Sequence, residues 1–163
     1  MNKYIQNKTF DEINIGDTAI IHHSLTKRDI LLFAIMSGDI NPAHLDEEYA
    51  KSDLFHQIVA HGMWGASLIS TVLGTKLPGP GTIYLNQSLR FLHPIFVGDL
   101  ITTQVTVKEK RPEKHHVLLD CLCYNQRNIE VIQGIAEVIA PTEKIRRKRV
   151  ELPSVDEFLE KLK

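Results

Sequence analysis

The stretch from Gly62 to Leu73 (GMWGASLISTVL) constrains the fold of this chain more than any other feature. It is almost wholly apolar and long enough for a helix of about three turns. A helix that is apolar on every side is normally buried, so the rest of the chain must enclose it. We expect it to end at Gly74, just before the turn-forming residues 77–81 (LPGPG).

The periodicity changes after this helix. Four segments rich in β-branched residues follow, separated by turn residues, and each is predicted to be a strand: 82–91, 99–108, 116–125 and 129–138. Because the connections are short, neighbouring strands should pair antiparallel. The pattern predicts an α+β fold, with an antiparallel sheet wrapped around the buried central helix.

The residues before the central helix read as a strand, a helix and a loop. Residues 18–24 are typical of a strand, and Thr26 is a suitable N-cap for a helix that stops near Ser37 and Gly38. Pro42 forces the preceding residue out of helical geometry, so residues 39–42 should form an irregular loop. A short helix is expected at 47–52.

Length, charge and cysteine content exclude several classes of protein. The chain has 163 residues and a net charge of -1, which suits one compact domain and gives no electrostatic case for nucleic-acid binding. Cys121 and Cys123 lie on the same face of a predicted strand, so we expect no disulfide and a cytoplasmic location. No segment is long and apolar enough to act as a signal peptide or to span a membrane.

Residues 33–50 (FAIMSGDINPAHLDEEYA) contain the strongest candidate for chemistry. Asp39 and His44 lie five residues apart across a proline-containing loop, and such a pair can move protons on and off a bound water. The alternative is that Asp39 and Asn41 are ordinary turn formers and that His44 is structural.

These residues belong to a string, SGDINPAH (37–44), that resembles the hydratase 2 motif of MaoC-like (R)-specific enoyl-CoA hydratases. The resemblance extends from about residue 15 to 138. It includes three further segments that match the start of the central helix, the next strand and the turn after it: HGM (61–63), YLNQSLRF (84–91) and PIFVGD (94–99). It implies a single hotdog fold.

The resemblance also implies a reaction, in which water adds across the double bond of a trans-2-enoyl-CoA to give an (R)-3-hydroxyacyl-CoA. Asp39 and His44 would hold the water and transfer both protons, and the sequence leaves open which is formally the base. The N–H of Gly62 would polarise the thioester carbonyl from the start of the buried helix, where N–H groups lack partners. The alternative for Gly62 is tight helix packing.

Three further residues are candidates for substrate binding or for support of the pair. Asn41 would shape the loop or hold the pair, Ser70 would support it by a hydrogen bond, and Gln87 would flank the site from a strand. Each could instead be structural. His61 is interpreted as structural. We expect no cofactor, and the paired histidines at 22–23 and 115–116 lack further ligands, so we expect no metal site.

A single hotdog leaves one sheet edge open, and family members are homodimers or larger assemblies, so we expect a homo-oligomer that takes an acyl-CoA substrate. Two other functions stay open. A hotdog acyl-CoA thioesterase would direct water at the carbonyl carbon, and a non-catalytic module would only bind acyl-CoA.

The chain is expected to divide into a hotdog domain at 1–140 and a tail at 141–163. Residues 144–149 (KIRRKR) are a basic run, interpreted as a solvated linker or as a contact for the phosphates of CoA or another polyanion. A short amphipathic helix is predicted from Leu152 to Lys163, with Ser154 as its N-cap and Glu157 three residues on.

Overall fold

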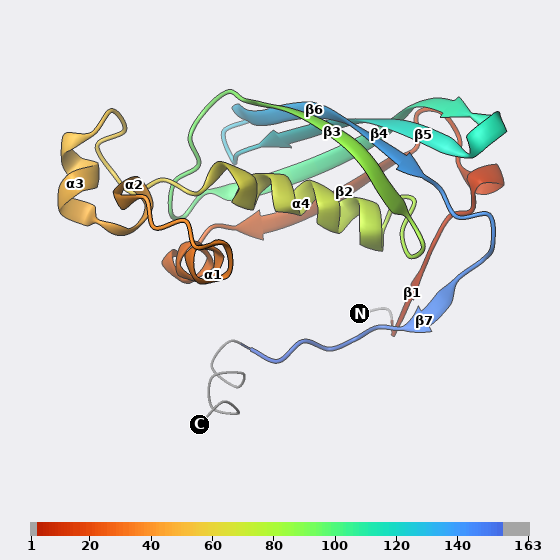
Figure 1. Ribbon diagram of the computed structural model, residues 1–163, viewed down its shortest axis with the longest axis horizontal. Coiled ribbons are helices and arrows are strands. Elements are labelled where there is room, and N and C mark those ends of the chain that lie inside the picture. The colour runs from red at the N-terminus through yellow and green to blue at the C-terminus, as the bar shows by residue number, and fades with distance from the viewer. Residues whose placement is uncertain (1–2, 155–163) are drawn as a thin grey trace.

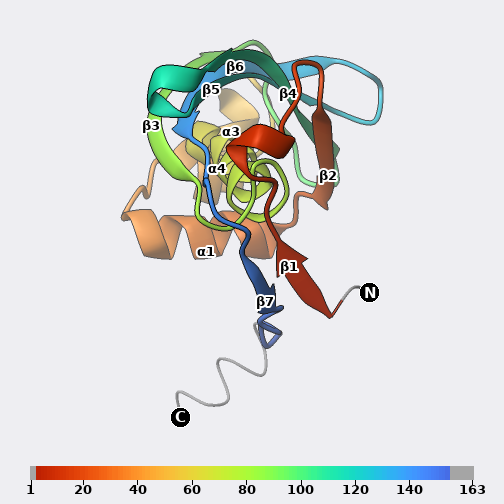
Figure 2. The same cartoon turned by 90° about the vertical axis from the view of Figure 1, so that its right-hand side faces the viewer.

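A curved antiparallel sheet encloses one long helix in the computed structural model, which describes residues 3–154. Figure 2 looks along helix α4 (Gly62–Thr75) and shows the sheet arching around it, with α1 (Lys27–Ser37) on the open side. The predicted α+β architecture is confirmed. The five strands are β2 (Thr18–Ser24), β3 (Ile83–Phe91), β4 (Leu100–Arg111), β5 (His116–Tyr124) and β6 (Glu130–Ile139).

The strand order of this sheet is β2-β4-β5-β6-β3, and every pair is antiparallel. The expected pairing of β4 with β5 and of β5 with β6 is confirmed. The expected pairing of β3 with β4 is wrong, because β3 joins β6 at the far edge. The connection at 92–99 does not form a hairpin, because it packs against the residues just before α4. Ala60 N–H donates to Ile95 O at 2.8 Å, and Val59 forms an isolated β-bridge with Phe96.

The helices before α4 follow the capping signals of the sequence. Helix α1 begins after Thr26, whose side chain accepts from Asp29 N–H, and ends at Gly38 in the left-handed conformation (φ 76°). Helix α3 (Glu47–Ser52) has the predicted bounds. Between them the structure adds α2 (Pro42–Leu45), which was not predicted. Within residues 3–154, no helix combines the length and apolarity that crossing a membrane requires.

The core lies between α4 and the concave face of the sheet. Trp64, Ile69 and Val72 of α4 are buried against strand residues such as Leu119 and Ile132. The expectation that α4 is buried on every side is wrong for the single chain, because one face is open to solvent: Met63 (57% exposed), Ser67, Ser70 and Thr71. The helix also continues through Gly74 to Thr75.

A second, two-stranded sheet projects from the main body (Figure 1). Strand β1 (Tyr4–Gln6) pairs antiparallel with β7 (Arg146–Lys148), and Arg146 lies over the ring of Tyr4 at 3.9 Å. Part of the basic run expected to be a linker is therefore a strand. Residues 152–154 have no regular structure, and the rest of the helix predicted up to Lys163 lies outside the described residues.

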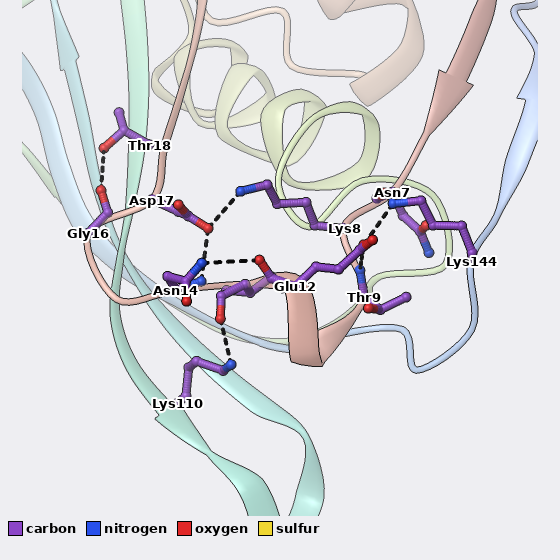
Figure 3. A network of polar contacts seen from close by, with 11 residues as sticks. Asn7, Lys8, Thr9, Glu12, Asn14, Gly16, Asp17, Thr18, Lys110 and Lys144 are labelled. Carbon is purple, nitrogen blue, oxygen red and sulfur yellow. Dashed lines mark hydrogen bonds and ion pairs between the residues drawn. The ribbon is translucent and has the colours of Figure 1, made fainter.

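Polar contacts join residues 7–17 to one another and to Lys144 (Figure 3). Lys144 Nζ donates to Asn7 O and to the Glu12 carboxylate, both at 2.7 Å, and the bond to Lys144 is the main reason that the pKa of Glu12 is lowered. The pKa of Asp17 is lowered by hydrogen bonds from Asn14 N–H and from Lys8 Nζ. The first residue of the basic run thus has partners within the chain.

The two cysteines are free, as expected, and face the core. Cys121 is 3% exposed and Cys123 is fully buried, and burial raises the pKa of the Cys121 thiol to about 11. Because the thiolate is the reactive form, we predict that iodoacetamide labels the folded protein far more slowly at pH 8 than the protein in urea. Mass spectrometry of timed samples measures both rates, and equal rates would contradict the buried placement.

Candidate active site

The turn that follows α1 positions Asp39. Gly38 reverses the chain, and Asn41 N–H donates to Asp39 Oδ1 at 3.2 Å. Asn41 is itself the N-cap of α2, since its side chain accepts from Ala43 N–H at 3.1 Å, and Pro42 takes the first helical position, where a missing N–H costs nothing. Both bonds of Asn41 lie within the turn from Asp39 to Ala43, and its part in substrate binding stays a prediction.

The next turn positions His44, which is half-buried. Its Nδ1 lies 2.8 Å from Val59 O. A carbonyl can only accept, so the proton lies on Nδ1 and Nε2 of the neutral ring carries a lone pair. Its other nitrogen is thus available to take or return a proton.

His61 is the N-cap residue of α4 and is 1% exposed. Its Nε2 lies 3.0 Å from Asp39 O, and its ring centroid lies 3.9 Å from that of His44, with 33° between the planes. Its Nδ1 is buried and has no hydrogen-bond partner among the described residues. From the sequence alone, His61 is interpreted as structural and is not placed in the site. Its position in the HGM segment, directly before Gly62, is the signal that could have indicated its place.

Asp39, His44 and His61 form one compact group. Each offers a ligand atom within 4.8 Å of the others. Such a group can hold a water between acid and base, and two imidazoles with a carboxylate are also ligands that a transition metal accepts. The histidines at 22–23 and 115–116 lie elsewhere, and the expected absence of a metal stays a prediction.

Gly62 lies beside this group at the N-terminus of α4. Together with His44, His61 and Phe91 it lines an apolar cavity of about 300 Å³. A Cβ at Gly62 would lie 3.1 Å from the Phe91 ring, so glycine keeps this wall open. The first N–H groups of a helix lack intrahelical partners and carry partial positive charge, which suits a developing oxyanion.

The other two sequence candidates lie apart from this cavity in the single chain. Ser70 is exposed on α4, about 12 Å along the helix axis from Gly62. Gln87 lies on β3, where it accepts from the Tyr84 hydroxyl and donates to Ser88 O at 2.8 Å. Burial raises the pKa of Tyr84 to about 12, so it remains a donor. The structure thus brings together Asp39, His44 and Gly62, but not Ser70 or Gln87.

Comparison with known proteins shows the family of this chain. A family model described as a MaoC like domain matches residues 15–119. An (R)-specific enoyl-CoA hydratase of Rhodospirillum rubrum is 46% identical over 132 residues, covering 81% of this chain and 91% of the relative. A 3-hydroxybutyryl-CoA dehydratase of Methylorubrum extorquens is 39% identical, covering 81% of this chain and 83% of its own length.

Solved structures confirm the hotdog fold. An unliganded R-hydratase from Pseudomonas aeruginosa superposes with a TM-score of 0.88 at 43% identity, covering 93% of this chain and 97% of its own. An (R)-hydratase from A. caviae superposes with a TM-score of 0.77 at 38% identity, covering 79% and 98%. The family model spans more than half of the chain, and these relatives are covered over 83–98% of their length; this chain belongs to the MaoC-like domain family.

Proposed function

We propose that this protein hydrates trans-2-enoyl-CoA to (R)-3-hydroxyacyl-CoA. The hydratase relatives support the reaction. The observation that carries it in this chain is the fixed orientation of His44. With Nδ1 bonded to Val59 O, the other ring nitrogen is free to share a water with Asp39.

In the proposed mechanism Asp39 and His44 Nε2 bind one water. As the water oxygen attacks the β-carbon, the pair takes a proton from it, and a proton is delivered to the α-carbon. Atoms balance, because the oxygen and one hydrogen of water end as the hydroxyl and the other hydrogen ends on the α-carbon. The coupled pair carries out both transfers, and no metal or cofactor takes part in either.

Negative charge grows on the thioester oxygen during the attack. In the proposed arrangement Gly62 N–H donates to this oxygen at the start of α4. The cavity beside it is lined mainly by apolar side chains, among them Val59, Phe91 and Ile95, and a dry surrounding strengthens such a bond. The enoyl group would occupy this cavity.

A direct assay separates this function from its alternatives. Crotonyl-CoA is mixed with the protein, the loss of enoyl absorbance is followed, and the stereochemistry of the product is determined. Loss of absorbance with formation of the (R) product supports hydration. Release of free CoA thiol would instead indicate a thioesterase, and binding without either signal would indicate an acyl-CoA-binding module.

We further propose that the protein is a homodimer. Strand β3 is a sheet edge, and Ile83 (56%), Leu85 (45%) and Phe91 (53%) are exposed on it beside the open face of α4. An unpaired edge next to exposed apolar side chains is a ready surface for a second copy. Ser70 and Gln87 lie on these two elements, and we propose that they reach the substrate only in the dimer.

The proposed dimer can be tested by placing one charge on the β3 edge. Ile83→Glu should convert the dimer to a monomer, because a carboxylate would be buried without a partner. The matched control is Ile20→Glu, on β2 at the opposite sheet edge, where Ile20 is 37% exposed. Light scattering after gel filtration measures the mass. A wild-type monomer, or an Ile83→Glu dimer, would contradict the proposal.

We propose a functional unit at 1–140, to which the matched family segment belongs, with 141–163 as an appended tail. A reducing, cytoplasmic setting is supported by the two free, buried cysteines.

A further inference from the structure

We infer that His61 is a positioning residue that holds Asp39, His44 and Gly62 in one arrangement. The inference rests on the proposed hydration, because it assigns to His61 the alignment of the groups that perform it. His61 contacts the first two groups directly and precedes the third in the chain. No other described residue bonds to the Asp39 backbone and also stacks on His44.

The first contact fixes the Asp39 loop. Asp39 is exposed between the end of α1 and the start of α2. Its N–H donates to Ser37 Oγ and its Oδ1 accepts from Asn41 N–H, and both of these bonds are short-range. His61 Nε2–H donates to Asp39 O at 3.0 Å from a position that is 1% exposed. His61, the buried N-cap residue of α4, therefore fixes the backbone of Asp39, from which the carboxylate extends.

The second contact fixes the His44 ring. The two imidazoles lie 3.9 Å apart between centroids, and the ring of Phe33 packs on His61 at 5.0 Å. His44 is therefore held by its bond to Val59 O and by the ring of His61. Because an imidazole that moves protons must keep one nitrogen aimed at the water, loss of either restraint should slow the transfer.

The third feature is a fixed tautomer. The bond to Asp39 O places the proton of neutral His61 on Nε2, which leaves Nδ1 as a buried lone pair with no partner among residues 3–154. Buried acceptors are normally satisfied, and a water in the space next to Asp39 and His44 would satisfy this one. A protonated Nδ1 would be a buried donor for which the described residues supply no acceptor.

Two variants remove the bond and the ring contact one at a time. His61→Gln keeps an amide N–H that can replace Nε2 but removes the ring, whereas His61→Phe keeps the ring and removes the donor. We expect each to lower kcat for crotonyl-CoA by about 10- to 100-fold, with KM nearly unchanged, since a displacement near 1 Å has such an effect. A large rise in KM with constant kcat would overturn the inference.

A double-mutant cycle distinguishes positioning from a general structural role. If His61 acts through Asp39, adding His61→Phe to Asp39→Asn should cost little further activity. If its role is only structural, the two losses should multiply, and the melting temperature of His61→Phe should fall in parallel. Multiplied losses would overturn the inference.

The tautomer gives a test that does not depend on activity. In protein labelled with ¹⁵N-histidine, the imidazole nitrogen shifts of His61, assigned by comparison with His61→Gln, should show a protonated Nε2 and a bare Nδ1. A proton on Nδ1, alone or together with Nε2, would overturn the inference. If this result holds but the wild-type protein leaves crotonyl-CoA unchanged, the proposed hydration has failed while the described geometry stands.

Discussion

Asp39→Asn is expected to reduce kcat for crotonyl-CoA hydration by roughly 100- to 10,000-fold, the usual range for loss of an acid–base group. Asparagine preserves size and can still accept from Asn41 N–H, as Asp39 Oδ1 does, so the loop should keep its shape. What it loses is the ability to exchange a proton with water. His44→Ala should have an effect of similar size, because it removes the ring that is fixed against Val59 O.

The matched control is Asp46→Asn, a few residues further along the same segment. Asp46 is the N-cap of α3 and accepts from Glu48 N–H and Tyr49 N–H. Asparagine is an equally good N-cap, so both activity and stability should be retained. Initial rates over a range of crotonyl-CoA concentrations measure all three variants. If Asp39→Asn were as active as Asp46→Asn, the carboxylate would have no part in the chemistry.

Gly134→Ala should have the largest effect on stability. Gly134 lies in β6 opposite Leu89 of β3, and an added Cβ would lie 1.9 Å from Ser88 O. The obstructing atom is backbone and cannot rotate away, so β3 must move off β6. Overpacking typically costs about 1–3 kcal/mol, and a backbone clash belongs at the upper end or beyond.

Gly74→Ala tests the same substitution where space is free. A Cβ at Gly74 meets nothing within 4 Å, and alanine is favoured over glycine in a helix by about 1 kcal/mol. Urea denaturation should therefore show a lower midpoint for Gly134→Ala and an unchanged or higher one for Gly74→Ala. Equal midpoints for Gly134→Ala and the wild-type protein would show that β3 and β6 are not paired as described.

Local signals predicted most of the elements but not their partners. Capping residues predicted α1, and β-branched segments predicted the four strands after α4, because these signals act within a few residues. The pairing of β3 with β6 depends on a connection of eight residues that follows the surface of the core, which no local rule specifies. Strands β1 and β7 have three residues each and no apolar alternation, so they carried no signal.

The exposed face of α4 shows a related limit. The small residues Gly, Ser and Thr hardly interrupt the apolar segment, so the whole helix reads as buried. Composition does not say which face the chain's own sheet leaves uncovered. The helix α2 did have a local signal, Asn41 as N-cap with Pro42 behind it, which the loop interpretation overlooked.

For the candidate site, the motif predicted Asp39 and His44, and the structure places them together. Gly62 was predicted from the start of the buried helix and lines the same cavity as His44. The contacts of His61 with Asp39 and His44 could not be predicted, because these partners lie 22 and 17 positions away in the sequence. Only the folded chain brings them together.

Hydration of crotonyl-CoA in D₂O tests the central proposal most directly, since it follows the protons that Asp39 and His44 are proposed to move. We expect an (R)-3-hydroxybutyryl-CoA that carries one deuterium at the α-carbon by NMR, formed by the wild-type protein and at least about 100-fold more slowly by Asp39→Asn and His44→Ala. Unchanged crotonyl-CoA, an (S) product, or equal rates in the three proteins would contradict it.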